Sequence, residues 1–212
     1  MANRKRLDLT RHLPSGTFVV LFLMVLAGFA GAFIYAGAYN VGADAPHWGI
    51  VHNTLDTLRE RSIARSAKGI EVPADLNAPE RISSGAGLYT DMCASCHLGP
   101  GLGPSELSQG LYPPAPELAK TGLEDTPGEQ FWAIKHGIKL SAMPAWGRTH
   151  NDKLIWDMVA FIRQLPKMSP ERYRAAVASA PAGHDEMMEA VPGTSGGGAD
   201  HHAEGSAGEH SH

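Results

Sequence analysis

The residues of this sequence that could do chemistry lie in one short segment. Cys93 and Cys96 are the only cysteines of the chain, two positions separate them, and His97 follows directly. Two thiols at this spacing can add to the two vinyl groups of a single haem, and the adjacent imidazole can then bind the iron as an axial ligand. The segment therefore predicts one covalently bound haem c, attached through Cys93 and Cys96, with His97 as a metal ligand.

Pairs of cysteines at this spacing also occur in zinc sites and in thioredoxin-like redox proteins. Structural zinc commonly takes four ligands, and the region expected to fold holds no second C-x-x-C or H-x-x-x-H cluster. A thioredoxin-like pair needs a surrounding α/β pattern, and no run in this sequence has the pattern of a buried strand. Covalent haem is therefore the favoured interpretation.

The other axial position of the iron has three candidate ligands. Met143 lies in a flexible-looking loop, residues 137–144, from which its thioether can reach the distal face of a haem. His136 and His150 are nearby rivals. We expect Met143 as the second metal ligand. An iron held by both His97 and Met143 has no open position for oxygen or substrate, so this ligation indicates an electron carrier rather than a catalyst.

Helical segments are expected on both sides of these ligands. The first runs from Pro79 to about Met92 and leads into the cysteines, and a loop rich in glycine and proline follows over residues 98–118. Thr126 and Glu129 have capping-box spacing for a short helix that ends at Gly137. A last helix is expected from residues 149–152 to Leu165, with Met158 on its apolar stripe. The predicted fold class is all-α.

Several residues around the cysteine segment recur in a known pattern: Gly85 and Tyr89 before it, Phe131–Trp132 and His136–Gly137 before Met143–Pro144, and the final run Phe161–Leu165. On these residues the chain resembles, over roughly Pro79 to Met168, the class I c-type cytochromes. The resemblance implies a small all-α domain whose first and last helices cross near Gly85 and pack around one haem edge. It also implies that the thioether edge of the haem stays exposed.

Residues 17–39 carry no charge and predict a transmembrane anchor. At about 1.5 Å per residue they reach roughly 34 Å, enough to cross a hydrocarbon core of about 30 Å. Four basic residues precede them, so residues 1–16 are expected in the cytoplasm. We expect a single-pass protein of the bacterial inner membrane with its C-terminal domain in the periplasm. The alternative is a cleaved signal peptide, which the length of the apolar stretch disfavours.

The remaining segments have compositional interpretations. Residues 40–78 are expected to form a juxtamembrane helix over Pro46–Lys68 and then a linker; the helix could lie on the membrane, on a partner, or on its own domain. Residues 169–212 are expected to form a disordered tail. The tail holds five histidines that could bind metal weakly, although a solvated tail is favoured: His184, His201, His202, His210 and His212.

Charge and ligation together narrow the function. The net charge of −4 lacks the basic excess that nucleic-acid binding needs. We expect single-electron transfer between respiratory complexes or dehydrogenases and a terminal acceptor, with redox partner proteins in or at the membrane. One alternative is a haem c subunit of a larger membrane oxidase or reductase. Another is metal handling by the histidine-rich tail.

Overall fold

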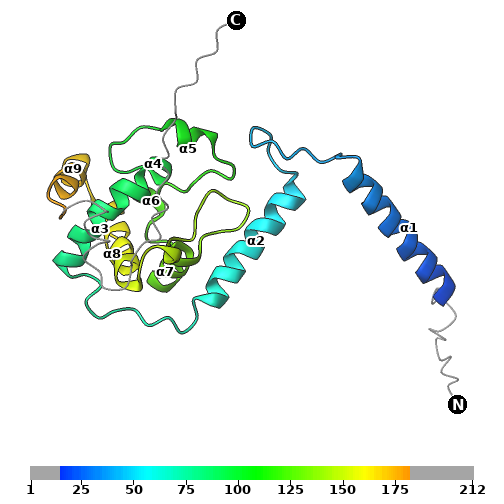
Figure 1. The fold of residues 1–212 in the computed structure, drawn as a ribbon, viewed down its shortest axis with the longest axis horizontal. Coiled ribbons are helices and arrows are strands. Elements are labelled where there is room, and N and C mark those ends of the chain that lie inside the picture. Colours follow the sequence, from blue (N-terminus) through cyan, green and yellow to red (C-terminus); the bar gives the residue numbers. More distant parts are fainter. Residues whose placement is uncertain (1–14, 182–212) are drawn as a thin grey trace, which may run out of the picture. The chain divides into compact units, whose positions relative to one another are not determined.

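The computed structural model of the chain describes residues 15–181, which are helical and contain no strand (Figure 1). The predicted all-α class is therefore confirmed for these residues. The chain divides into two compact units, Met1–Ala45 and Pro46–His212. The elements are α1 (Gly16–Tyr35) in the first unit and, in the second, α2 (Gly49–Ser66), α3 (Pro79–Met92), α4 (Ala94–His97), α5 (Glu106–Gly110), α6 (Leu118–Thr121), α7 (Pro127–His136), η2 (Trp146–Arg148), α8 (Asp152–Ile162), η3 (Leu165–Lys167) and α9 (Pro170–Ala178).

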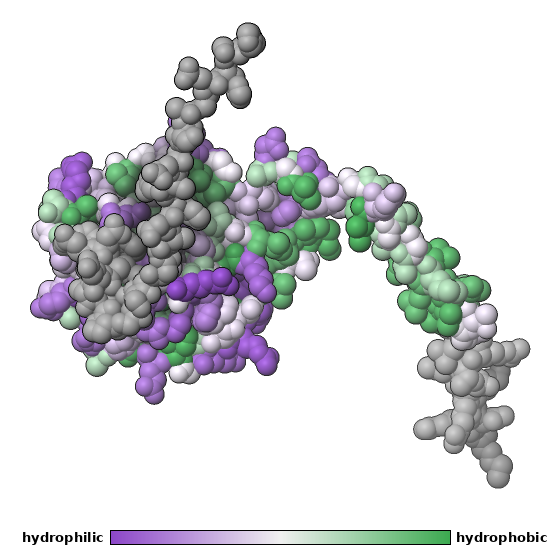
Figure 2. Space-filling model, viewed as in Figure 1, coloured by the Kyte–Doolittle hydropathy of each residue, from purple (hydrophilic) through white to green (hydrophobic). Residues whose placement is uncertain are grey.

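Helix α1 is apolar on all sides. The Ser15 hydroxyl caps its start by accepting a bond from the amide of Phe18 (3.3 Å), and Gly37, with a φ of 61°, follows its end. None of its residues is buried, and the face in Figure 2 is almost wholly hydrophobic. Its 20 residues reach about 30 Å, so α1 is long and apolar enough to cross a membrane. The helix ends before residue 39, the expected limit of the anchor.

The core of the second unit forms where α3 and α8 cross. A Cβ atom on Gly85 would collide with the backbone carbonyl of Asp157 and would lie 2.8 Å from Cβ of Phe161. The absence of a side chain at Gly85 therefore lets the two helices approach, as the resemblance implied. Met158 is fully buried, which confirms its expected place in the core.

An ionic network joins the two crossing helices to the segment before them. Nη1 of Arg81 donates to Oδ1 of the fully buried Asp157 (2.7 Å), and Nζ of Lys153 lies 2.9 Å from Oδ2. Nε of Arg81 forms an ion pair with Oδ2 of Asp75 (3.0 Å), and the Arg81 guanidinium lowers the pKa of that carboxyl group. Leu76 is buried in the core. Residues 70–78 were expected to be a simple linker, and these contacts instead fix them to the domain.

Helix α2 packs on its own domain, against α7. Val51, Leu55 and Ile63 lie along a half-buried face, whereas Leu58 is exposed. At the start of the helix, the amide of His47 donates to the hydroxyl of Tyr112 (2.8 Å). Among the alternatives for the juxtamembrane helix, the structure therefore shows the one in which it covers its own domain.

Side chains cap the N-terminal ends of α7 and α8 in two different ways. The amide of Thr126 donates to Glu129 (2.8 Å) and the amide of Glu129 to the Thr126 hydroxyl (3.3 Å), so the predicted capping box of α7 is confirmed. Helix α8 is capped by Asn151, whose side chain accepts from the amide of Leu154 (3.0 Å). The helix begins within the expected range of residues 149–152, and Thr149 does not cap it, because the Thr149 hydroxyl is bonded to the Trp146 carbonyl (3.3 Å).

Two segments expected to lack regular structure contain short helices. The loop over residues 98–118 holds α5, which begins with a capping box between Ser105 and Ser108, and it runs into α6. Residues 170–178, expected as the start of a disordered tail, form α9, because Ser169 caps the helix and Tyr173 is buried. The domain thus continues past residue 168. The five histidines of the tail lie outside the described residues.

Candidate haem-binding site

One turn of helix brings the two cysteines and the histidine together at the end of α3. Cys93 ends α3, and its carbonyl accepts bonds from the amides of Cys96 (3.1 Å) and His97 (2.9 Å). Cys93 is buried, whereas Cys96 and His97 are half-buried. The two sulfurs and the imidazole are therefore held on one tight turn, α4, as attachment to a single haem requires.

The loop after this turn fixes the orientation of the imidazole. Nδ1 of His97 lies 2.9 Å from the carbonyl oxygen of Pro116. A carbonyl oxygen can only accept, so Nδ1 carries the proton and the lone pair of Nε2 is available to a metal. Burial lowers the pKa of His97, although the bond to Pro116 opposes that shift, and the neutral ring is the form that binds iron. Sequence reasoning missed Pro116.

Met143 is held by a closed turn rather than by the flexible loop that the sequence suggests. The amide of Ile138 donates to the carbonyl of Met143 (3.1 Å), and the amide of Met143 donates to the Ser141 hydroxyl (3.2 Å). Gly137, with a φ of 65°, packs so closely that a Cβ atom there would lie 2.8 Å from the Met143 carbonyl. Met143 is half-buried against the hydrophobic core that also contains Cys93.

The two rival histidines have other surroundings. His136 is exposed, and its ring lies 5.0 Å from that of Trp132. His150 is buried, with Nδ1 2.8 Å from the Thr149 hydroxyl and its ring edge-on to Trp146 at 5.5 Å. Each imidazole ring therefore packs against a tryptophan four residues earlier in the sequence.

The geometry at the cysteines also bears on the alternatives to haem. Burial, reinforced by Cys96, raises the pKa of the Cys93 thiol to about 12, whereas reactive redox pairs depend on a thiol whose pKa is lowered. Within residues 15–181, no three histidine, cysteine or acidic side chains gather as a metal site. Two sulfurs on one turn beside an imidazole with a free Nε2, and a thioether packed on the same core, suit a covalently bound haem.

Comparison with known proteins gives matches over this domain. The family model described as cytochrome c oxidase, cbb3-type, subunit III matches residues 80–162. A cbb3-type cytochrome c oxidase subunit, FixPc, of Rhizobium leguminosarum bv. viciae is 31% identical over an alignment of 117 residues that covers 52% of this chain. The match spans 36% of that relative, so the chain covers only about a third of its length.

Proposed function

We propose that this chain, which resembles the class I c-type cytochromes and matches the cbb3-type subunit III model over residues 80–162, carries a single covalently bound haem c. We propose further that it passes single electrons between proteins in or at a membrane. Cys93 and Cys96 would attach the haem, and His97 and Met143 would bind its iron. The observation that carries the proposal is the bond between His97 Nδ1 and Pro116, because it holds the imidazole in the tautomer that presents Nε2.

The roles of the individual residues follow from their chemistry. Cys93 and Cys96 would each hold the haem through a thioether bond to one of its two vinyl groups. His97 gives a nitrogen ligand of fixed orientation, and Met143 gives a soft sulfur ligand that favours the reduced metal. When bound, the haem supplies a one-electron iron couple at a high potential. With the iron held by both His97 and Met143, the domain would be suited to transfer of electrons and not to binding of substrate.

A redox titration of the purified protein tests this proposal. We expect one reversible wave with the slope of a single electron, because one haem is attached and its ligands do not change between oxidation states. We also expect the reduced wild-type protein not to bind carbon monoxide, because Met143 occupies the coordination position of the iron that carbon monoxide would need. Rapid carbon monoxide binding by the wild type would show an open site and would contradict the carrier function.

The location we propose follows from α1 and the residues before it. Basic residues cluster in the N-terminal segment of the sequence, which favours a cytoplasmic N-terminus and a haem domain in the periplasm of a bacterium. Retention of α1 tethers the domain to one surface, so that encounters with membrane-bound redox partners occur at a high effective concentration.

This location predicts an integral membrane protein with an intact N-terminus. The haem protein should stay in the membrane fraction after washing at high salt and be released only by detergent, because the whole apolar length of α1 has to leave the bilayer. N-terminal sequencing checks the same point independently. A soluble haem protein that begins after Ala38 or Ala45 would show instead that the apolar segment is a cleaved signal.

A second candidate function is a permanent haem c subunit of an oxidase complex. The two cbb3-type matches favour it. Size measurement after extraction in mild detergent distinguishes the two functions, because a shuttle is expected to migrate alone and a subunit with its complex. The metal-handling alternative rests on histidines beyond residue 181 and gains no support from the described structure.

A further inference from the structure

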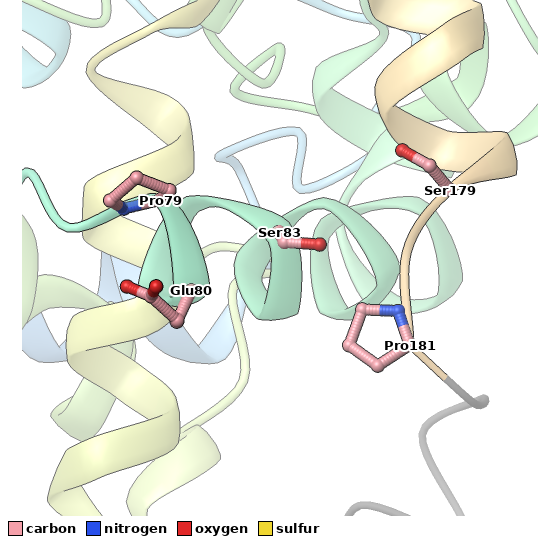
Figure 3. Close-up of a pocket in the computed structure, with 5 residues that line it drawn as sticks. All are labelled: Pro79, Glu80, Ser83, Ser179 and Pro181. Carbon is pink, nitrogen blue, oxygen red and sulfur yellow. The ribbon is translucent and has the colours of Figure 1, made fainter.

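Helix α9 lies beyond residue 162, where the match to the family model ends, yet it packs along α3. Figure 3 shows the end of α9 beside the start of α3, where Ser179 and Pro181 line a shallow groove together with Pro79, Glu80 and Ser83. The start of α9 lies against the chain that follows the cysteine turn, where Pro170 is close to Gly101 and Tyr173 is close to Gly99. The groove itself has no sulfur or imidazole lining, so the contacts at the start of α9 are the ones that reach the candidate haem site.

The first turn of α9 lies directly against the chain that leaves the haem ligand. Tyr173 is 3% exposed, and a Cβ atom on Gly99 would lie 2.8 Å from Cζ of its ring. A Cβ atom on Gly101, which has a φ of 79°, would lie 2.7 Å from Cβ of Pro170. The two glycines are therefore pressed against α9 with no space for a side chain. Both distances are far shorter than an ordinary van der Waals contact between carbon atoms.

Between His97 and Gly99, Leu98 has an unusual backbone conformation. Its φ is 58° and its ψ is −161°, a region that residues with a side chain rarely adopt. The fully buried Tyr89 of α3 holds it by donating from its hydroxyl to the Leu98 carbonyl (2.6 Å). Strained backbone of this kind persists only where its surroundings fix it. Here Tyr89 supplies the support from α3, and Tyr173 supplies it from α9 through Gly99.

We infer that α9 is a brace for the proximal side of the haem, and that Tyr173 is a positioning residue that acts on His97 through its contact with Gly99. This inference rests on the proposed ligation by His97. The ring of Tyr173, rather than its hydroxyl, makes the contact that matters. Ring atom Cζ is the atom nearest to a Cβ on Gly99 (2.8 Å), whereas the hydroxyl lies near that of Thr90, which itself donates to the Ala86 carbonyl (2.9 Å).

The brace predicts that a methyl group at Gly99 disturbs the haem. In Gly99→Ala the new Cβ atom has to displace either the Tyr173 ring or the backbone at Leu98. Because Leu98 directly follows His97, the displaced backbone changes the position of the imidazole. We expect a lower reduction potential than in the wild type, because water gains access beside the displaced ligand, and faster amide hydrogen exchange at Leu98 and Gly99. Gly103→Ala is the matched control in the same loop, since nothing lies within 4 Å of a Cβ atom there.

A second change distinguishes a specific pair from general damage. Tyr173→Leu removes the ring atoms that meet the new methyl group, so Gly99→Ala with Tyr173→Leu should return the potential and the exchange rates toward the wild type. Tyr173→Phe keeps the ring and should preserve both. Equal potentials for Gly99→Ala and Gly103→Ala, or additive shifts in the double variant, would overturn the inference. Haem staining of the wild type on a denaturing gel tests the proposed function separately, because its failure there would not depend on α9.

Discussion

Met143→Ala is expected to open the iron to external ligands. The substitution removes the only sulfur ligand that we assign to the distal side, and alanine cannot replace it. The oxidised protein should lose the weak long-wavelength absorption that sulfur ligation gives, and the reduced protein should bind carbon monoxide. Axial ligands spread haem potentials over about 0.8 V, so a fall in the reduction potential on the order of 0.1 V or more is expected.

Met158→Leu is the matched control for this variant. Met158 is fully buried in the α3–α8 core, and a swap that conserves volume there should cost less than about 1.5 kcal/mol. The control should therefore keep the sulfur absorption, exclude carbon monoxide and hold its potential. If Met143→Ala behaves like the control, another residue holds the distal position, and alanine variants of His136 and His150 would identify it.

Replacing both cysteines, Cys93→Ala with Cys96→Ala, is expected to abolish covalent haem completely. Alanine offers no sulfur to a vinyl group, and the sequence has no other cysteine to substitute. Haem-dependent peroxidase staining after denaturing electrophoresis measures the result, because only attached haem migrates with the chain. Ser95→Ala, between the two cysteines and exposed, is the control that should keep the stain. Staining of the double variant at the wild-type level would contradict the attachment that we propose.

Much of the fold could be predicted because its strongest signals are local. Pro79 at the start of α3 and the Thr126–Glu129 capping box of α7 depend on neighbouring residues only, and both mark helix starts in the structure. The close crossing at Gly85 came from the family resemblance. The cap of α8 could not be chosen from residue type, because Thr149 and Asn151 are both good capping residues; in the structure the Thr149 hydroxyl is bonded to the Trp146 carbonyl, and Asn151 caps the helix.

Other features have no sequence pattern of their own. The partner of His97 is a backbone carbonyl at Pro116, and every residue has such a carbonyl, so only the path of the loop selects it. Helix α9 is short and largely polar, and it belongs to the domain because one side chain, Tyr173, is buried. Leu76 is buried in the core although it lies in the expected linker, because a single apolar residue between two polar ones does not indicate burial in the sequence.

In the candidate site, too, some residues could be predicted from the sequence and others could not. The cysteine segment specifies its chemistry by residue type and spacing alone, so Cys93, Cys96 and His97 could be proposed without a structure. The distal ligand depends on which loop approaches the opposite face of the haem, and three residues of the sequence met that requirement. The closed turn at Met143 and its packing on the shared core favour it over His136, which is exposed.

The mass of the intact wild-type protein, measured after extraction with acidified acetone, shows whether the haem is covalently attached to the chain. This solvent removes haem that is held only by axial ligands and leaves haem that is bonded to cysteine sulfur. We predict a mass that exceeds that of the polypeptide by one haem, with the added mass on the peptide that contains Cys93 and Cys96. A mass equal to that of the bare polypeptide, with the haem in the solvent, would contradict it.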